Sequence, residues 1–421
     1  MGDLCTDDPF CDPEHPKLVS YDSVQAAKNR LQGEVCRTRC KKSERLSEQY
    51  EMNIYLKMEI EQNTGSFKDR GAFNAIKAEL KVNSKVKGVI SASAGNHAVA
   101  LAYAGQKLGV PVIVVMPTSA PLVKIEACER CHAEVRLHGE HIGEAKTLGL
   151  KLARVKGYTY INGYDHPEII SGQATVATEI FEDVEHVDAV IVPTGGGGLI
   201  AGVAVVAAAE RPHCKVIGVE SEASTGFQQA LDKGHPVDTP LLGTLAHGLA
   251  VPKAGVNSLA TAKSNVHKML TVREPSLVKG ILKLFEGDKI VAEGAGAAGV
   301  AALIEGLLSD YTGKTVVIIV SGGNIDTTQV GDILERALVL ERRLLKFDIT
   351  VTDLSSGLST LGEVAKKTLC NFKKIEQEIQ WHSDRNFSIV MKCVVETKNC
   401  QHSNEFMKAI AEHFTSSSFH C

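Results

Sequence analysis

The chain has 421 residues, and its 46 Lys and Arg against 50 Asp and Glu give a net charge of −4. This length predicts roughly two to three domains, and the lack of a basic excess argues against binding to nucleic acid or to an acidic membrane surface. Apolar residues at 44% and charged residues at 23% are typical of a folded globular protein. No apolar run approaches the roughly 20 residues of a membrane span.

The N-terminal segment and the cysteines predict a reducing compartment. Residues 1–16 are acidic and polar, without the basic and then apolar order of a secretory signal, and the cysteines number 11. We therefore expect reduced thiols and a cytoplasmic protein. Cys128 to His132 spell the C-x-x-C-H pattern of haem attachment, but ordinary cysteines at the end of a helix are the favoured interpretation.

Beyond residue 50, apolar runs alternate with helical patterns. The polar segment 1–50 contains one amphipathic helix, and the helical stretches that follow are rich in Ala and Leu. Short apolar runs without alternation suit strands buried on both faces, and the order of strand, helix and strand predicts right-handed βαβ units and a parallel sheet. We expect an α/β body over residues 51–345. The predicted helices include Asp22–Gln32, Ala98–Leu108 and Ala201–Ala209, and the predicted strands are Ile54–Met58, Val86–Ser91, Val112–Met116, Ala133–Leu137, Ala189–Val192, Val216–Val219 and Val316–Val320.

The pattern changes near Arg342, and residues 346–421 predict a separate module. A helix over Val330–Leu345 would join it to the body, and we place the boundary at about residue 345. The order β-α-β-β-α is most of a small ferredoxin-like α+β fold. Its expected elements are a strand at Phe347–Val351, a turn at Ser355–Gly357, a helix at Leu361–Leu369, strands at Ile375–Gln380 and Phe387–Val395, and a helix at Glu405–Phe414.

Lys68 lies in a turn between a predicted strand and the predicted helix Arg70–Leu80, directly after Ser66 and Phe67. An amine that is partly withdrawn from water at such a junction can have a lowered pKa and act as a nucleophile that forms a Schiff base. By itself, a surface lysine at a helix start is the more common outcome.

Two further loops indicate a cofactor with one phosphate group. The segment VIVPTGGGG (Val190–Gly198) precedes the predicted helix Leu199–Glu210, so four glycines let the backbone approach an anion at a helix N-terminus. The loop lacks Gly-Lys-Ser/Thr and the dinucleotide pattern, which favours a monophosphate. Ser321 ends the last strand of the body, where ligands bind in doubly wound sheets. A Schiff-base lysine, a monophosphate site and a hydroxyl together favour pyridoxal phosphate.

These loops resemble the signature loops of fold-type II pyridoxal-phosphate enzymes. Over about residues 20–330 the chain is most similar to threonine/serine dehydratases and their relative serine racemase. The resemblance implies a fold like that of the tryptophan synthase β subunit, with parallel sheets and helices in two interwoven lobes. Residues 346–421 resemble an ACT-type regulatory module, incomplete or degenerate because Asp353–Gly357 replaces the usual Asp-x-Pro-Gly turn. The motifs are Thr64–Ala72, Ser93–His97, Gly195–Gly198 and Ser321–Asn324.

The resemblance also implies a role for each matching residue. Lys68 would form the Schiff base with the cofactor and remove the α-proton of the substrate. Phe67 would pack beside the cofactor ring, Asn96 would hydrogen-bond the 3-hydroxyl, and Ser321 would meet the pyridine nitrogen. The phosphate would be held by Gly195, Gly196, Gly197, Gly198 and Leu199, the ring would be flanked by Gly248 and Glu293, and the substrate carboxylate would be bound by Ser93, Ala94, Gly95, Asn96 and His97.

The implied reaction is the deamination of L-threonine to 2-oxobutyrate and ammonia by β-elimination of water, and of L-serine to pyruvate and ammonia. The alternative is a serine racemase with secondary dehydratase activity. Racemases carry a serine acid/base where this chain has Ala94, which cannot move a proton. An alternative of another class is a cofactor-bound amino-acid sensor without turnover, against which the intact Lys68, Asn96 and Ser321 argue.

Partners and metals follow from the same resemblance. We expect a small-molecule amino-acid substrate and a homo-oligomer, either a dimer or a tetramer, with no nucleic acid and no membrane. Relatives bind a divalent cation just after the strand that ends at Glu220. Here Glu220 and Glu222 are present but Gly226 stands at the later acidic position, so solvated carboxylates are favoured over a Mg²⁺ or Ca²⁺ site.

Overall fold

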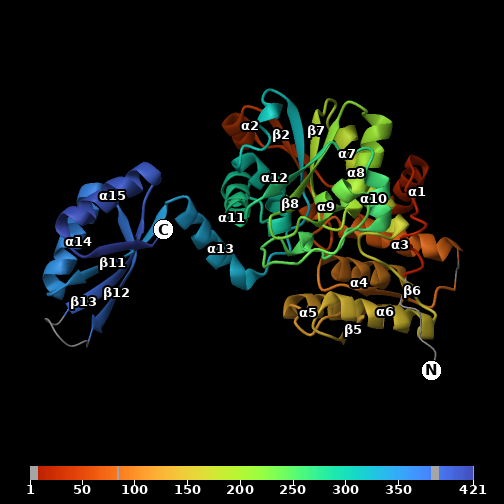
Figure 1. Cartoon of the computed structure of the whole chain (residues 1–421), viewed down its shortest axis with the longest axis horizontal. Coiled ribbons are helices and arrows are strands. Elements are labelled where there is room, and N and C mark those ends of the chain that lie inside the picture. Colours follow the sequence, from red (N-terminus) through yellow and green to blue (C-terminus); the bar gives the residue numbers. More distant parts are fainter. Residues whose placement is uncertain (1–7, 83–84, 381–387, 421) are drawn as a thin grey trace. The chain divides into compact units, whose positions relative to one another are not determined.

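The computed structural model describes residues 8–82, 85–380 and 388–420. The chain forms two compact units, Met1–Asp326 and Thr327–Cys421 (Figure 1). The first seven residues of the expected N-terminal segment, and Phe387 at the start of an expected strand, lie outside the described residues. Within the described ranges no helix has the length and apolar character needed to cross a membrane.

The larger sheet of the first unit has six strands in the order β1-β2-β10-β7-β8-β9. β1 runs antiparallel to β2, and the other neighbouring pairs are parallel. The central strands are buried along most of their length, as expected for apolar runs without alternation. The strands are β1 (Cys40–Lys42), β2 (Asn53–Met58), β7 (Ala189–Pro193), β8 (Lys215–Ser221), β9 (Lys268–Val272) and β10 (Thr315–Val320).

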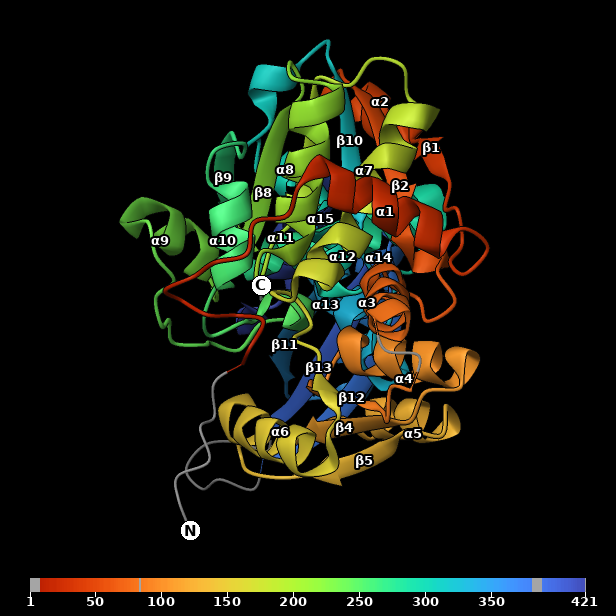
Figure 2. The same cartoon turned by 90° about the vertical axis from the view of Figure 1, so that its right-hand side faces the viewer.

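A smaller sheet of four parallel strands has the order β5-β4-β3-β6. The chain enters this sheet after β2 and returns to the larger sheet at β7, so the two lobes are interwoven. Figure 2 shows the smaller sheet and its helices α4, α5 and α6 beneath the larger sheet. The strands are β3 (Val89–Ala92), β4 (Val112–Met116), β5 (Glu134–Leu137) and β6 (Thr159–Tyr160).

Helices flank both sheets of the first unit, which confirms the predicted α/β class. The first six are α1 (Tyr21–Leu31), α2 (Glu44–Tyr50), α3 (Lys68–Val82), α4 (Asn96–Leu108), α5 (Leu122–Arg130) and α6 (Ile142–Lys156). They are followed by α7 (Pro167–Asp183), α8 (Gly198–Glu210), α9 (Gly226–Lys233), α10 (Val256–Ala262), α11 (Glu274–Lys283) and α12 (Gly294–Ile304).

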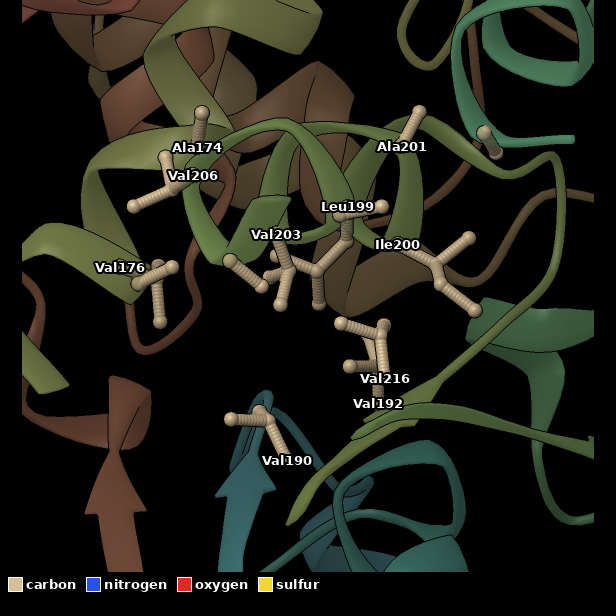
Figure 3. Close-up of a cluster of buried hydrophobic side chains, with 14 of the residues drawn as sticks. Ala174, Val176, Val190, Val192, Leu199, Ile200, Ala201, Val203, Val206 and Val216 are labelled. Carbon is tan, nitrogen blue, oxygen red and sulfur yellow. The ribbon is translucent and has the colours of Figure 1, made fainter. Parts of the chain in front are cut away.

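The core of the larger lobe is built around α8. Its sequence is apolar on all sides, so the helix is stable only where every face is covered. Figure 3 shows α8 side chains such as Leu199 and Val203 pointing toward Val192 on the sheet. On the opposite side α8 packs against α7, where a Cβ at Gly202 would lie 2.8 Å from the Cα of Ala174. This packing fixes the N-terminus of α8 at the carboxyl end of β7.

The second unit contains an antiparallel sheet in the order β12-β13-β11-β14. Its apolar core includes Phe347, Met391 and Phe406. A fourth strand that the sequence did not predict, β14, pairs with β11 and completes the β-α-β-β-α-β order of a ferredoxin-like fold. The elements are α13 (Thr327–Leu340), β11 (Leu344–Val351), α14 (Leu354–Thr368), β12 (Asn371–Gln380), β13 (Ser388–Glu396), α15 (Cys400–His413) and β14 (Ser417–His420).

Two local predictions for this unit are wrong. The helix expected over Val330–Leu345 ends at Leu340, because Arg342 adopts a left-handed backbone with φ 52° and β11 begins two residues later. The turn expected at Ser355–Gly357 is instead the first turn of α14. The carboxylate of Asp353 caps that turn by accepting the N–H of Ser356 at 2.7 Å.

Candidate active site

The loop that carries Lys68 is paired with the loop after β10. Ser66 and Gly322 form an isolated antiparallel bridge, and the N–H of Phe67 donates to the carbonyl of Ser321 at 3.1 Å. The Asp69 carboxylate also accepts the N–H of Thr64 at 3.0 Å, which closes the turn before α3. Two segments far apart in the sequence are therefore held together, with Lys68 as the first residue of α3.

The amine of Lys68 is poised to act as a nucleophile. Its Nζ donates to the carbonyl oxygen of Gly163 at 2.7 Å and lies 5.0 Å from the centre of the Phe67 ring. Burial lowers the pKa of Lys68 to about 8, and the carboxylate of Glu293 opposes this shift. A larger fraction of this amine is therefore neutral near physiological pH than for an exposed lysine, and the neutral amine is the form that attacks an aldehyde.

The four glycines lie between β7 and α8, as the sequence predicts. Gly197 is the N-cap of α8 with φ 96°, and no side chain caps this helix end. A Cβ at Gly196 or Gly198 would overlap Tyr164, and one at Gly197 would overlap the ring of Phe227. The backbone thus passes through a space in which only glycine fits, and Leu199 follows in the first turn of α8. The N–H groups at the start of a 13-residue helix form a suitable site for a phosphate dianion.

A second loop packs against this glycine cradle (Gly195–Gly198). A Cβ at Gly195 would lie 2.9 Å from the Cα of Leu249, which places the short helix His247–Leu249 beside the cradle. A Cβ at Gly248 would in turn lie 3.7 Å from Oε1 of Glu293. The structure therefore brings Gly248 and Glu293 together between the cradle and α12, whose N-cap is Glu293.

Asn96 and Glu293 meet across the two lobes. Nδ2 of Asn96 donates to Oε1 of Glu293 at 2.7 Å, and Oδ1 of Asn96 accepts from Nδ2 of Asn324 at 3.0 Å. A Cβ at Gly322 would lie 2.6 Å from Oε1 of Glu293, so the turn after Ser321 also reaches this carboxylate. Burial raises the pKa of Glu293, and nearby cationic and amide groups oppose the shift.

The predicted substrate loop lies at the N-terminus of α4, where Gly95 is the N-cap and no side-chain hydrogen bond caps the helix. The Ser93 hydroxyl accepts the N–H of Gly95 at 3.3 Å, and Ala94 contributes only a methyl group. The His97 imidazole is buried beside Gly163, and neither ring nitrogen has a hydrogen-bond partner among the described residues. Burial lowers the pKa of His97 to about 3, so the ring is neutral. A buried imidazole without partners marks a place where a polar ligand would bind.

The two carboxylates weighed as metal ligands have other partners. Glu220 is buried, and its carboxylate accepts the N–H groups of Phe227 at 2.7 Å and Gln228 at 3.1 Å, at the start of α9. Burial raises the pKa of Glu220 to about 7 against the effect of these two bonds. Glu222 accepts the N–H of Glu274 at 3.0 Å. In the described part of the chain, no three or more His, Cys, Asp or Glu side chains are grouped so that they could hold a metal ion.

Several residues that complete the site were not predicted from the sequence. Gly163 accepts the Lys68 amine and Tyr164 packs beneath the cradle, although both lie in an irregular segment without a motif. Lys124 donates to Oδ1 of Asn96 at 3.2 Å from α5. Asn324 belongs to the motif Ser321–Asn324, but that motif does not predict its hydrogen bond to Asn96.

The fold and these loops are those of an enzyme whose cofactor carries a phosphate group and an aldehyde. The aldehyde of such a cofactor reacts with a lysine amine. The residues fit pyridoxal phosphate, because an uncapped helix N-terminus with a glycine cradle and a lysine of lowered pKa occur in one site. The family model described as "Pyridoxal-phosphate dependent enzyme" matches residues 31–322, and the chain belongs to this family. Its cofactor is pyridoxal phosphate.

Two curated relatives and one solved structure are similar to this chain over most of its length. The L-threonine ammonia-lyase of Geobacter sulfurreducens is 36% identical over 92% of this chain and 96% of its own. That of Thermotoga maritima is 37% identical over 90% of this chain and 98% of its own. Among solved structures, maize serine racemase has a TM-score of 0.72 at 29% identity, covering 77% of this chain and 99% of its own. The first unit holds residues 1–326, so the match to each ammonia-lyase extends into the second unit.

Proposed function

We propose that this chain is an ammonia-lyase that converts L-threonine to 2-oxobutyrate and ammonia, and L-serine to pyruvate and ammonia. The observation that carries the proposal is that Lys68 is the group suited to proton transfer. Its Nζ is held by the Gly163 carbonyl and its pKa is lowered to about 8, whereas the neighbouring loop offers the methyl group of Ala94, a Ser93 hydroxyl that accepts the N–H of Gly95, and a His97 whose pKa is lowered to about 3. Elimination needs a base on one face of the substrate, and racemisation needs a second acid/base on the other.

The residues of the chain have distinct tasks in this reaction. Bound pyridoxal phosphate supplies an electron sink that makes the α-hydrogen of the amino acid acidic. Lys68 removes that proton as a neutral amine, and the Gly163 carbonyl and the Phe67 ring hold its Nζ in place. The uncapped N-terminus of α4 binds the substrate carboxylate through backbone N–H groups of the loop Ser93–His97.

The cofactor itself would be held at three points. The glycine cradle and Leu199 would bind the phosphate at the N-terminus of α8, and Asn96 would donate a hydrogen bond to the 3-hydroxyl group. Ser321 would face the pyridine nitrogen, and Gly248 and Glu293 would lie beside the ring. A hydroxyl does not force the nitrogen to be protonated, so the sink is weaker than one supported by a carboxylate. A weaker sink favours prompt loss of the β-hydroxyl over a long-lived carbanion.

The second candidate is serine racemase, which the TM-score of 0.72 to the maize enzyme favours. Both ammonia-lyases match more of this chain than that structure does, and we place the dehydratase first for this reason and because of Ala94.

We propose that residues 51–345 are the catalytic body and that residues 346–421 are an ACT-like regulatory module. We also propose a cytoplasmic homo-oligomer, either a dimer or a tetramer.

The test measures three products from purified protein loaded with cofactor. We expect 2-oxobutyrate from L-threonine and pyruvate from L-serine, with D-serine formed far more slowly than pyruvate. Lys68→Ala should abolish release of both oxo acids, whereas Lys77→Ala should not, because Lys77 lies further along the same helix in a partly exposed ion pair with Glu34. Formation of D-serine as fast as pyruvate would favour the racemase. Ammonia release by Lys68→Ala would refute the assignment of the base.

The same assay tests whether Ala94 is the reason that elimination is favoured over racemisation. Ala94→Ser should raise the ratio of D-serine to pyruvate by restoring a hydroxyl that can carry a proton on the second face. An unchanged ratio would remove Ala94 as the reason for placing the dehydratase first.

A further inference from the structure

Lys124 is a charged residue in the site to which the proposed reaction gives no task. It is the third residue of α5, in the smaller lobe. Its Nζ donates to Oδ1 of Asn96 at 3.2 Å and to the main-chain carbonyl of Asn324 at 3.3 Å. Asn324 follows β10 of the larger sheet, so the lysine joins α5 to the opposite lobe at the point where Asn96 meets Glu293.

These contacts determine the orientation of the Asn96 amide. Oδ1 of Asn96 accepts from two donors, Lys124 Nζ and Asn324 Nδ2, while Nδ2 of Asn96 donates to Glu293. If the amide turned over, its NH₂ group would face an ammonium and another amide NH₂, and its oxygen would face a carboxylate. The flipped amide would lose its hydrogen bonds at three sites and gain repulsion at each.

The amine of Lys124 differs from that of Lys68 in its surroundings. Burial lowers the pKa of both amines and the Glu293 carboxylate opposes the shift in each, but the Nζ of Lys68 has one carbonyl acceptor, whereas that of Lys124 donates to both an amide oxygen and a carbonyl. Two hydrogen-bond acceptors hold the Lys124 amine in one position. This arrangement suits a fixed hydrogen-bond donor better than a nucleophile.

We propose that Lys124 is a positioning residue that fixes the Asn96 amide with its N–H groups directed toward Glu293 and the cofactor. The inference rests on the proposed function only in that Asn96 contacts the cofactor. One amide hydrogen of Asn96 is engaged by Glu293, and the second is the donor that the 3-hydroxyl group would receive. Without the lysine, only Asn324 and Glu293 of the described residues hold the amide, so Asn96 presents its oxygen there more often, and binding weakens because the amide no longer donates to the cofactor oxygen.

The test uses cofactor-loaded protein without substrate and reads cofactor binding directly. Lys124→Met removes both donated bonds at similar length, Lys124→Gln is a second variant in case the first does not fold, and Lys151→Met replaces an exposed lysine of α6 as the control. We expect the Kd for pyridoxal phosphate to rise about 10- to 100-fold in the Lys124 variants, the amount that loss of a charged hydrogen bond produces. The visible absorption band of the bound cofactor should shift in these variants and not in Lys151→Met.

A double-mutant cycle with Asn96→Ala separates positioning from a general loss of stability. If Lys124 acts through Asn96, Lys124→Met should change the Kd and the absorption band very little in the Asn96→Ala background. Lys124→Arg should restore the position of the band, since a guanidinium can donate to both acceptors. Effects of Lys124→Met and Asn96→Ala on binding that are fully additive, or a Lys124→Met protein with the Kd and band of the wild type, would overturn the inference.

The outcome does not depend on turnover. If the wild-type protein binds the cofactor but releases no ammonia from threonine or serine, the proposed reaction fails while the cycle still decides the role of Lys124.

Discussion

Gly197 offers the sharpest test of the phosphate site, because the structure provides a matched control. Gly197 has φ 96° at the N-cap of α8, and Gly234 has φ 75° at the C-cap of α9. A Cβ at Gly197 would overlap the buried ring of Phe227, whereas one at Gly234 would have nothing within 4 Å. Replacing either glycine with alanine therefore imposes the strain of a positive φ, with a steric clash only at the cradle.

The expected losses of stability follow from the backbone strain and from the steric clash. An alanine in the left-handed region costs about 1–2 kcal/mol at either position. Overpacking against Phe227 adds about 1–3 kcal/mol at Gly197 alone. We expect Gly234→Ala to lower the free energy of unfolding of the cofactor-free protein by about 1–2 kcal/mol and Gly197→Ala to lower it by about 2–5 kcal/mol.

Cofactor affinity should separate the variants further. Relief of the clash moves the backbone N–H groups at the start of α8, which bind the phosphate in our proposal, so Gly197→Ala should lose about 10- to 100-fold in affinity for pyridoxal phosphate. Gly234→Ala should bind as the wild type does. Urea titration of the cofactor-free proteins and equilibrium dialysis with the cofactor measure the two effects. If both variants bound the cofactor equally well, the cradle would not be the phosphate site.

Three further predictions concern other parts of the first unit. The rate at which cofactor-free protein takes up pyridoxal phosphate should rise with pH and level off above about pH 8, because the pKa of Lys68 is lowered to about 8 and the neutral amine reacts; a rate still climbing at about pH 10 would indicate an ordinary lysine. Arg70→Met should lower the free energy of unfolding by about 3–5 kcal/mol, since it leaves the buried carboxylate of Glu59 without its guanidinium partner. Arg39→Met, which breaks an exposed pair, should cost less than about 1 kcal/mol, and equal denaturation midpoints for the two would contradict the argument. His132→Gly should raise the urea midpoint, because His132 adopts φ 59° after α5 and glycine removes about 0.5–1 kcal/mol of net strain; a lower midpoint would show that the histidine stabilises this turn.

Most of the strands that the sequence predicted are buried, and their burial is visible in the sequence as a continuous apolar run. The runs at residues 112–115 and 316–320 are continuous Val and Ile, and the structure places them in β4 and β10 with few differences at the ends. Two of the strands that were missed, β1 and β6, have no such apolar run. β6 has only two residues, and β1 is the polar sequence Cys-Lys-Lys at the edge of its sheet. These form because neighbouring strands offer free hydrogen-bonding groups, which depends on the folded sheet and not on the residues themselves.

The glycine cradle and Lys68 were predictable because their chemistry depends on backbone close to the motif. Lys124 was not, because its neighbours Asn96 and Asn324 are 28 and 200 residues away in the chain. A single lysine near the start of an amphipathic helix resembles a solvent-exposed residue. His132 is a similar case, since nothing in the sequence indicates the left-handed backbone that it adopts after α5.

The site also shows why the net charge of −4 said little about the ligand. Two lysines, Lys68 and Lys124, face the single carboxylate of Glu293, and the uncapped N-termini of α4 and α8 add positive potential without any charged side chain. Locally the site is therefore electropositive within an acidic protein. The proposed ligands are a phosphate and an amino-acid carboxylate, both anionic, and they require this local field. Part of the field comes from the backbone at helix ends, and composition cannot report that part because only the fold creates it.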